Sequence, residues 1–185
     1  DRSSPPAEKM VLAVGRLGAI KGMANLVRAF ARVHRKIPAA RLVLAGEGPE
    51  RSILEQLVRQ LDIAPAVKMT GVLSEREVIE CHRKCWVYAQ PSTGDESFSM
   101  STLEAFASGL SVVASDRVRV AKEFQKDDAV KIYPAHDEAA LEQLLLDALS
   151  LPWEANREQG RRARAMVEKT FLAQAVIPRI EKLFA

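Results

Sequence analysis

The feature that most constrains the fold is the alternation of short apolar runs with stretches of helical spacing. The runs are MVLAVG (Met10–Gly15), RLVLAG (Arg41–Gly46), VKMTG (Val67–Gly71), CWVYAQPS (Cys85–Ser92), LSVVAS (Leu110–Ser115) and AVKIYP (Ala129–Pro134). Continuous apolar runs of this length are typical of parallel strands buried on both faces. Strands that alternate with helices predict right-handed crossovers. The sequence therefore predicts an α/β fold, a doubly wound, parallel, six-stranded Rossmann-like sheet in the order 3-2-1-4-5-6.

Helices are predicted between the strands and after the last one. Met23–Ile37 repeats apolar residues at helical spacing, and Ser74–Glu77 (SERE) has capping-box spacing that predicts a helix start. Gly109 is expected to end the helix before the fifth strand. After Glu138 the pattern is helical to the end, with breaks near residues 152 and 170. A buried stripe is predicted for the second helix at Ile53, Leu54, Leu57, Val58 and Leu61.

Composition limits the class of protein. With 185 residues, 48% of them hydrophobic and 28% charged, the chain has the size and composition of one globular domain. The net charge of +3 is too small and too mixed to indicate nucleic acid as a partner. No apolar run approaches the ~20 residues of a membrane span. The two cysteines, Cys81 and Cys85, are too few for a disulfide framework and favour a reducing, cytoplasmic location.

The first eight residues, DRSSPPAE, are polar and contain Pro5-Pro6, which cannot continue a preceding helix. Residues 1–8 are therefore predicted to be a linker, with one domain following over residues 9–169. We expect the sequence to be part of a longer protein.

The predicted topology brings together two loops with complementary chemistry. The first strand is followed by GRLGAIKG, with Arg16 and Lys21, and the fourth by PSTGDESFS, with Glu96 at the start of a helix. Neighbouring strands whose helices cover opposite faces open a crevice at their carboxyl ends. Two cations and a helix N-terminus at one crevice predict an anion site suited to phosphate or diphosphate.

Two glutamates, Glu96 and Glu104, stand eight positions apart across this turn. A carboxylate beside a phosphate site is repelled by the phosphate but binds sugar hydroxyls well. The pair could hold hydroxyls on either side of a diphosphate, as in a nucleotide sugar. Taken singly, each has a simpler interpretation: Glu96 as an acid at a helix N-terminus and Glu104 as a solvent-facing helix residue.

The chain resembles the C-terminal, donor-binding domain of retaining GT-B glycosyltransferases, the group 1 or glycogen-synthase-like family, so the sheet would be one half of a GT-B fold. VGRLGAIKG is similar to the motif of the first strand, LAGEGPE to a following glycine-rich turn, and MTGVLS to the loop near the nucleotide base. Glu96 and Glu104 match the E-x7-E signature. The resemblance implies that residues 170–185 form a helix packing toward an N-terminal, acceptor-binding domain outside this sequence.

The resemblance also implies roles for individual residues. Arg16, Lys21 and Glu96 would be the catalytic residues, with the two cations stabilising the leaving diphosphate without a required metal or other cofactor. Glu96 would contact the transferred sugar and Glu104 the ribose hydroxyls. The remaining donor-binding residues would be Gly15, Gly46, Gly71, Val72, Ser97, Phe98, Ser99 and Met100. The acceptor would be a glycan, a lipid-linked glycan or a small molecule held by the other domain.

Two segments depart from the family pattern. ESFS (residues 96–99) stands where the family usually has E-G-F-G, which removes the backbone freedom of glycine near the phosphates. SDRVRVAKEF (residues 115–124) stands where the family commonly has two glycines, so no contacts are transferred to that segment. These departures keep open a non-catalytic nucleotide-binding or scaffolding module, and a GT-B nucleotide-sugar epimerase is a further alternative.

Other polar groups have mainly structural interpretations. Cys81, His82 and Cys85 lack a fourth ligand at a recognised spacing, so inert thiols are favoured over a metal site. Gly46 and Gly71 are equally consistent with turn glycines. The basic residues Arg28, Arg32, Arg35 and Lys36 fit a solvated helix surface, or a peripheral contact with anionic lipid at the inner membrane surface.

Overall fold

A computed structural model describes residues 4–125 and 128–171 of the chain. These residues form a single six-stranded parallel sheet in the order β3-β2-β1-β4-β5-β6, which confirms the predicted fold class and strand order. The strands are β1 (Met10–Val14), β2 (Arg41–Ala45), β3 (Val67–Gly71), β4 (Val87–Gln90), β5 (Ser111–Ser115) and β6 (Val130–Tyr133). The order reverses between β1 and β4, which pair in register through Val11 with Val87 and Leu12 with Tyr88.

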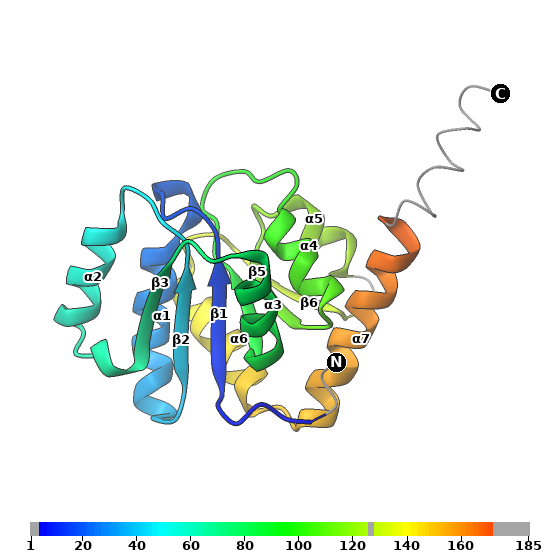
Figure 1. Cartoon of the computed structure of the whole chain (residues 1–185), viewed down its shortest axis with the longest axis horizontal. Coiled ribbons are helices and arrows are strands. Elements are labelled where there is room, and N and C mark those ends of the chain that lie inside the picture. Colours follow the sequence, from blue (N-terminus) through cyan, green and yellow to red (C-terminus); the bar gives the residue numbers. More distant parts are fainter. Residues whose placement is uncertain (1–3, 126–127, 172–185) are drawn as a thin grey trace.

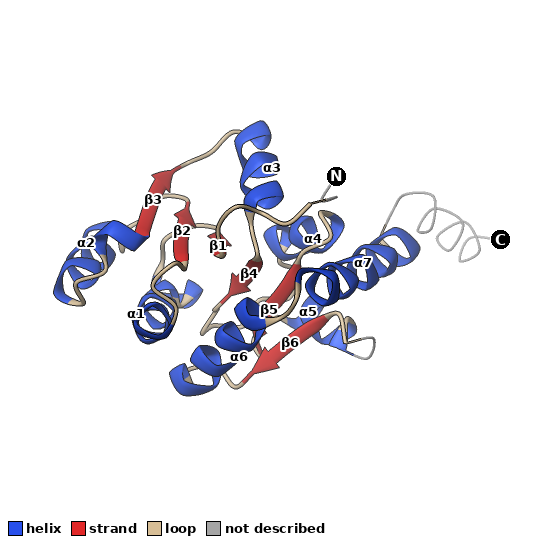
Figure 2. Ribbon diagram, turned by 90° about the horizontal axis from the view of Figure 1, so that it is seen from below, coloured by secondary structure: helices blue, strands red, loops and turns tan. Residues whose placement is uncertain are grey.

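Helices cover both faces of the sheet, as Figures 1 and 2 show. One face carries α1 (Met23–Lys36), α2 (Arg51–Gln60) and α6 (Glu138–Ser150). The other carries α3 (Glu75–Lys84), α4 (Met100–Ala107), α5 (Arg119–Glu123) and α7 (Trp153–Thr170). Two short 3-10 helices, η1 (Ala19–Lys21) and η2 (Ala64–Ala66), precede α1 and β3. The helix α5 was not predicted from the sequence and lies within SDRVRVAKEF (residues 115–124).

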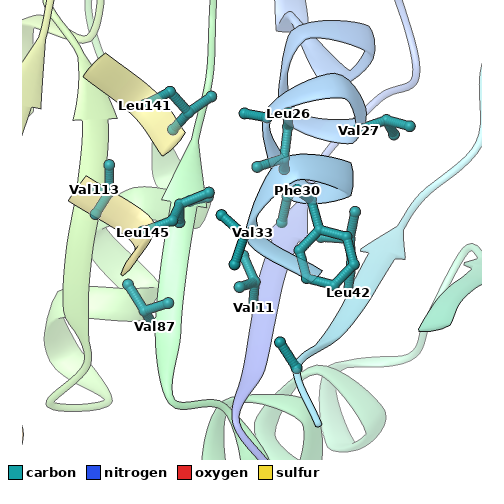
Figure 3. Packing of buried hydrophobic residues seen from close by; sticks show 14 of the residues in the cluster. Val11, Leu26, Val27, Phe30, Val33, Leu42, Val87, Val113, Leu141 and Leu145 are labelled. Carbon is teal, nitrogen blue, oxygen red and sulfur yellow. The ribbon is translucent and has the colours of Figure 1, made fainter. Parts of the chain in front are cut away.

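Each face of the sheet has its own hydrophobic cluster. On the first face, side chains of α1 and α6 pack on β1, β2, β4 and β5. Figure 3 shows Leu145 next to Val33, and Phe30 next to Leu42. On the second face, Tyr88, Phe106 and Phe124 belong to a cluster that also includes residues of α4 and α7. Apolar residues of the strands face both sides because the sheet is covered on both sides. This explains why the strands appear in the sequence as continuous apolar runs.

Helix ends follow the sequence signals closely. Ser74 and Glu77 form a complete capping box at the start of α3, and Gly109 follows α4 with a positive φ of 69°. A break at Pro152 separates α6 from α7. The predicted stripe of the second helix is correct at Leu54 and Val58 but wrong at Ile53, whose exposure is 58%, because α2 lies at the sheet margin and buries only a narrow stripe.

The basic face of α1 is not a free surface. Arg28 and Arg32 form ion pairs with Glu138, and Arg32 and Lys36 with Glu142, both on α6. Hydrogen bonds from Lys36 and Arg32 lower the pKa of Glu142. We call this set of pairs the α1–α6 seam. Three of the four cations that the sequence offered for contact with anionic lipid are therefore paired with acidic residues.

The predicted limits 1–8, 9–169 and 170–185 stay predictions, and residues 172–185 of the predicted C-terminal helix lie outside the described residues. Across residues 4–125 and 128–171, no helix combines the length and hydrophobicity needed to span a bilayer.

Candidate functional site

The loops that follow β1 and β4 meet at the carboxyl edge of the sheet. The N–H groups of Thr93 and Gly94 donate to the carbonyl of Ile20 at 2.8 and 3.2 Å. Gly22 packs so closely on the carbonyl of Pro91 that a Cβ there would lie 1.9 Å from the oxygen. These backbone contacts fix the two loops against each other.

Lys21 and Glu96, predicted from the two loops, are in direct contact. Lys21 Nζ lies 2.5 Å from Glu96 Oε1. The other carboxylate oxygen, Oε2, accepts from Ser92 Oγ at 2.5 Å and from Gln90 Nε2 at 3.1 Å. Burial opposes ionisation of Glu96, but the hydrogen bonds from Lys21 and Ser92 outweigh it and lower the pKa of this carboxyl. Glu96 is therefore held as a carboxylate.

Gln90 and Tyr88 support Glu96 from inside the sheet, a role that was not predicted from the sequence. Both side chains are fully buried. The Tyr88 hydroxyl donates to Gln90 Oε1 at 2.9 Å, which turns the Gln90 amide so that its N–H donates to Glu96. Burial raises the pKa of Tyr88, so its hydroxyl stays a donor. The sequence signal for this role is a polar residue, Gln90, at the end of an otherwise apolar strand.

The backbone of Glu96 is held by the segment after β5. Its N–H donates to the carbonyl of Arg117, and its carbonyl accepts from the N–H of Arg119, both at 2.9 Å. Ser115 Oγ also donates to the carbonyl of Ser92 at 2.5 Å. The segment SDRVRVAKEF, to which no site contact was assigned, thus positions Glu96.

The helix α4 begins beside this pair. Its N-cap residue, Ser99, is buried and makes no side-chain cap bond to the helix backbone. Ser99 Oγ instead accepts from Thr102 Oγ1 at 2.9 Å. The first-turn N–H groups of α4 are thus left without a side-chain cap, as an anion site at a helix start requires. Phe98 and Met100 are 55% and 58% exposed at the same turn, and Ser97 is exposed as well.

A cavity of about 300 Å³ lies at the ends of β1 and β2 and brings several predicted residues together. Gly15, Arg16, Gly46 and Val72 line it. Arg16 is exposed. Gly46 has a φ of +143°, and a Cβ there would lie 1.9 Å from the carbonyl oxygen of Gly15. Gly46 is therefore required by backbone packing whatever the cavity binds. Gly71 pairs with Gly46, whose N–H donates to the Gly71 carbonyl at 2.8 Å.

Glu104 lines an adjoining cavity of about 380 Å³ rather than the one that contains Arg16. The two cavities share Leu73 and Val78. Burial and, after it, the nearby Glu75 carboxylate raise the pKa of Glu104. The two signature glutamates thus have opposite environments, because Glu96 has a cationic partner and Glu104 has an acidic neighbour.

Within the described parts of the chain, no group of three or more His, Cys, Asp or Glu side chains is placed to hold a metal ion. His82 is buried, with Nδ1 3.0 Å from Ser108 Oγ, and Cys85 is buried in the second hydrophobic cluster. Both positions fit the structural interpretation of these residues.

A doubly wound sheet with Lys21, Glu96 and a helix start at its switch point defines an α/β protein with a Rossmann-like fold. The family model described as glycosyl transferases group 1 matches residues 1–166. The chain belongs to this family.

Curated relatives and solved structures agree with this assignment. The chain is 30% identical over 146 residues to the phosphatidyl-myo-inositol mannosyltransferase of Mycolicibacterium smegmatis, covering 78% of this chain and 37% of that protein. Sucrose-phosphate synthase from Thermosynechococcus elongatus superposes with a TM-score of 0.84 at 26% identity, over 98% of this chain and 46% of that one. Anabaena Alr3699/HepE, solved in complex with UDP and glucose, gives a TM-score of 0.83 at 20% identity, over 96% and 48%. The chain thus spans less than half the length of these proteins.

Proposed function

We propose that this chain is the donor-binding part of a retaining glycosyltransferase and holds a nucleoside-diphosphate sugar at the carboxyl edge of its sheet. The observation that carries the proposal is the Lys21–Glu96 pair, which is fixed on two loops beside the uncapped start of α4. A cation, backbone donors and a carboxylate would meet a ligand that has phosphates next to sugar hydroxyls.

The diphosphate would lie between Arg16, Lys21 and the α4 turn. The amides of Ser97, Phe98, Ser99 and Met100 would contribute backbone donors there. As the bond to the sugar breaks, negative charge grows on the leaving phosphate, and these fixed donors and cations would stabilise that charge. Retention of anomeric configuration belongs to the proposal because the family resemblance implies it.

Nucleoside binding would use the two adjoining cavities. Glu104 lines one of them, where its carboxylate would accept the ribose hydroxyls. Val72 lines the other beside Gly15 and Gly46 and is 78% exposed, so a base could cover its apolar surface. Gly71 would position the adjacent Val72, and its carbonyl accepts a hydrogen bond from the N–H of Gly46 at the edge of the cavity.

The Lys21–Glu96 contact adds a step to this mechanism. Without ligand, Lys21 neutralises Glu96. A diphosphate would draw Lys21 toward its own charge and leave Glu96 Oε1 as an acceptor for a hydroxyl of the sugar. Phosphate and sugar binding would thus be coupled through one lysine.

The acceptor would be bound outside these residues, since the relatives are more than twice as long as the match. A glycan, a lipid-linked glycan or a small molecule fits this scheme. We place the protein in the cytoplasm. Any peripheral contact of Arg28, Arg32 and Lys36 with the inner membrane surface would compete with their ion pairs in the α1–α6 seam.

The test is a thermal-shift panel on the 185-residue chain with UDP, GDP, ADP and their glucose or mannose conjugates. A ligand at ~100 times its dissociation constant should add about 2.7 kcal/mol of stability. One base should stand out, and Arg16→Ala and Glu104→Ala should each reduce its shift, whereas Arg59→Ala on the exposed side of α2 should not. No shift with any nucleotide at millimolar concentration would refute the proposal for this chain and favour a scaffolding role.

Donor binding and sugar transfer should separate in this chain. The 185 residues are expected to bind the nucleotide but to transfer no sugar to a simple acceptor, because acceptor binding lies elsewhere. The measurement is the amount of free nucleotide released from a nucleotide sugar, quantified by chromatography with and without acceptor. Turnover that depends on acceptor would show that the acceptor site lies within these residues.

A further inference from the structure

A second group of cations encloses a cavity of about 210 Å³ between α3, α7 and the turn after α4. Arg83 on α3 and Arg157, Arg161 and Arg164 on α7 line it. We call these four side chains and their cavity the arginine groove. It shares no lining residue with the cavity around Arg16.

The backbone explains why these arginines converge. Arg157, Arg161 and Arg164 follow the i, i+4, i+7 spacing that places residues on one side of a helix. Gly160 lets α7 press onto the turn after α4, since a Cβ at Gly160 would lie 1.9 Å from the carbonyl oxygen of Gly109. The close approach brings the arginine stripe to the edge of the cavity.

The groove contains no carboxylate among its lining residues. The ion pairs of its arginines run along their own helices, with Arg83 Nη1 2.5 Å from Glu80, Arg161 Nη2 2.7 Å from Glu158 and Arg164 Nε 2.9 Å from Glu168. Exposed pairs of this kind contribute little to stability.

Arg157 has no ion pair within residues 4–125 and 128–171. Positive charge in the groove is thus only partly balanced, and the imbalance is greatest at Arg157.

The cavity also has a neutral polar wall. Ser108, which lines it, has its hydroxyl 3.0 Å from Nδ1 of His82. Several guanidinium groups and one hydroxyl around a small cavity match the donors that phosphate oxygens require, because each guanidinium offers two parallel N–H groups. We propose that the arginine groove binds a phosphate-bearing anion at a site additional to the donor cleft.

The site adjoins the cavity of Glu104, since Ile79, His82 and Ser108 line both. An anion in the groove would therefore lie near the nucleoside end of the proposed donor site while it depends on different cations. This arrangement allows the two sites to be tested separately in one protein.

The experiment measures binding of inorganic phosphate and pyrophosphate to the 185-residue chain by calorimetry at low ionic strength. It uses the single variant Arg157→Gln and the double variant Arg157→Gln/Arg161→Gln as test variants. Arg162→Gln is the control that matches the single variant in charge, and Arg16→Ala is the donor-cleft variant. Arg162 is exposed on α7 outside the groove lining. Each groove arginine should contribute about tenfold in affinity through charge-assisted hydrogen bonds. The double variant should therefore bind about a hundredfold more weakly, whereas Arg162→Gln and Arg16→Ala should keep the groove isotherm.

A second arm distinguishes the source of the phosphate. Sedimentation with phosphatidylcholine vesicles that contain phosphatidic acid, against phosphatidylcholine alone, tests a lipid headgroup. Binding only to the phosphatidic acid vesicles, lost in the double variant and kept in Arg162→Gln, would support the site with a lipid ligand. Saturable binding of the free anions that is lost in the double variant and kept in Arg162→Gln and Arg16→Ala would support it with a soluble one.

Two results would overturn the proposal. One is equal loss of binding in the double variant and in Arg162→Gln, which would indicate general attraction to a basic helix. The other is no binding in either arm while the unliganded variants melt like the parent chain. Glutamine is a good helix former at exposed positions, so the variants are expected to fold.

Discussion

Single residues at the carboxyl edge of the sheet determine how Glu96 is presented. Its two carboxylate oxygens accept hydrogen bonds from the side chains of Lys21, Ser92 and Gln90. Its backbone is bonded on both sides to the segment after β5. The charge and the position of this carboxylate therefore depend on residues that follow β1 and β5, the two strands beside β4.

Replacing Glu96 by glutamine should change the pH dependence of stability in a defined direction. The pKa of Glu96 is lowered in the folded state, so its charge stabilises the fold at pH values above the usual carboxyl pKa of about 4.3 and stops doing so as the pH falls through the folded value. Urea unfolding should show the parent chain more stable than Glu96→Gln at neutral pH, with the difference shrinking below pH of about 4. A difference that stays constant from pH 7 to acid would contradict this account.

Gln90 is a positioning residue, and Gln90→Leu tests it. Leucine has a similar size but leaves the Tyr88 hydroxyl and Glu96 short of a partner. The expected loss is about 1–3 kcal/mol in unfolding free energy. In addition, the pKa of Glu96 should rise because one hydrogen bond to its carboxylate is lost, measurable by NMR titration against the parent chain. A variant that loses stability but leaves the titration of Glu96 unchanged would limit Gln90 to a packing role.

Glu104→Gln should separate stability from binding. Burial and the neighbouring Glu75 disfavour its charge, so removing that charge should raise the unfolding free energy at neutral pH. Because Glu104 is exposed and its charge is screened by solvent, the gain should be about 0.5 kcal/mol or less. The same change should weaken nucleotide binding if Glu104 accepts ribose hydroxyls. Stabilisation without a loss of nucleotide binding would remove Glu104 from the proposed site.

Elements were more predictable from sequence than the contacts between side chains. The strands and the capping box of α3 follow from local patterns. A strand buried on both faces requires consecutive apolar residues, and the unpaired N–H groups of a helix start require a capping residue nearby in the sequence. The short α5 and the hold of Arg117 and Arg119 on Glu96 were not predicted. They depend on how the segment after β5 folds back onto the turn after β4, which no local pattern encodes.

The junction between α7 and the turn after α4 gives a test at this scale. In most helices Gly→Ala stabilises by up to about 1 kcal/mol. At Gly160 the sign should reverse, because the new Cβ would lie 1.9 Å from the carbonyl of Gly109, and overpacking of this kind typically costs about 1–3 kcal/mol. Denaturant unfolding of Gly160→Ala checks this, with Ala165→Gly on the exposed side of α7 as a control for helix propensity. Stabilisation by Gly160→Ala would show that α7 does not press on this turn.

At the scale of the whole molecule, two hydrophobic clusters share one sheet. Both tryptophans, Trp86 and Trp153, lie in the cluster of the α1 and α6 face, with ring centroids 5.6 Å apart. Because every strand except β3 contributes residues to both clusters, the two clusters should unfold together. Tryptophan fluorescence and far-ultraviolet circular dichroism are expected to give coincident urea transitions. An earlier fluorescence transition would show that the α1 and α6 face opens first.

The position of β1 in the middle of the sheet has a consequence for synthesis on the ribosome. β1 can pair with β2 once residue 45 has emerged, but its other neighbour, β4, ends only at residue 90. At roughly 5–20 residues per second, the free edge of β1 stays unprotected for several seconds in each nascent chain. That edge presents unpaired N–H and C=O groups between apolar side chains and can accept a foreign strand. Chaperone occupancy is therefore expected to be highest while residues 45 to 90 are being made.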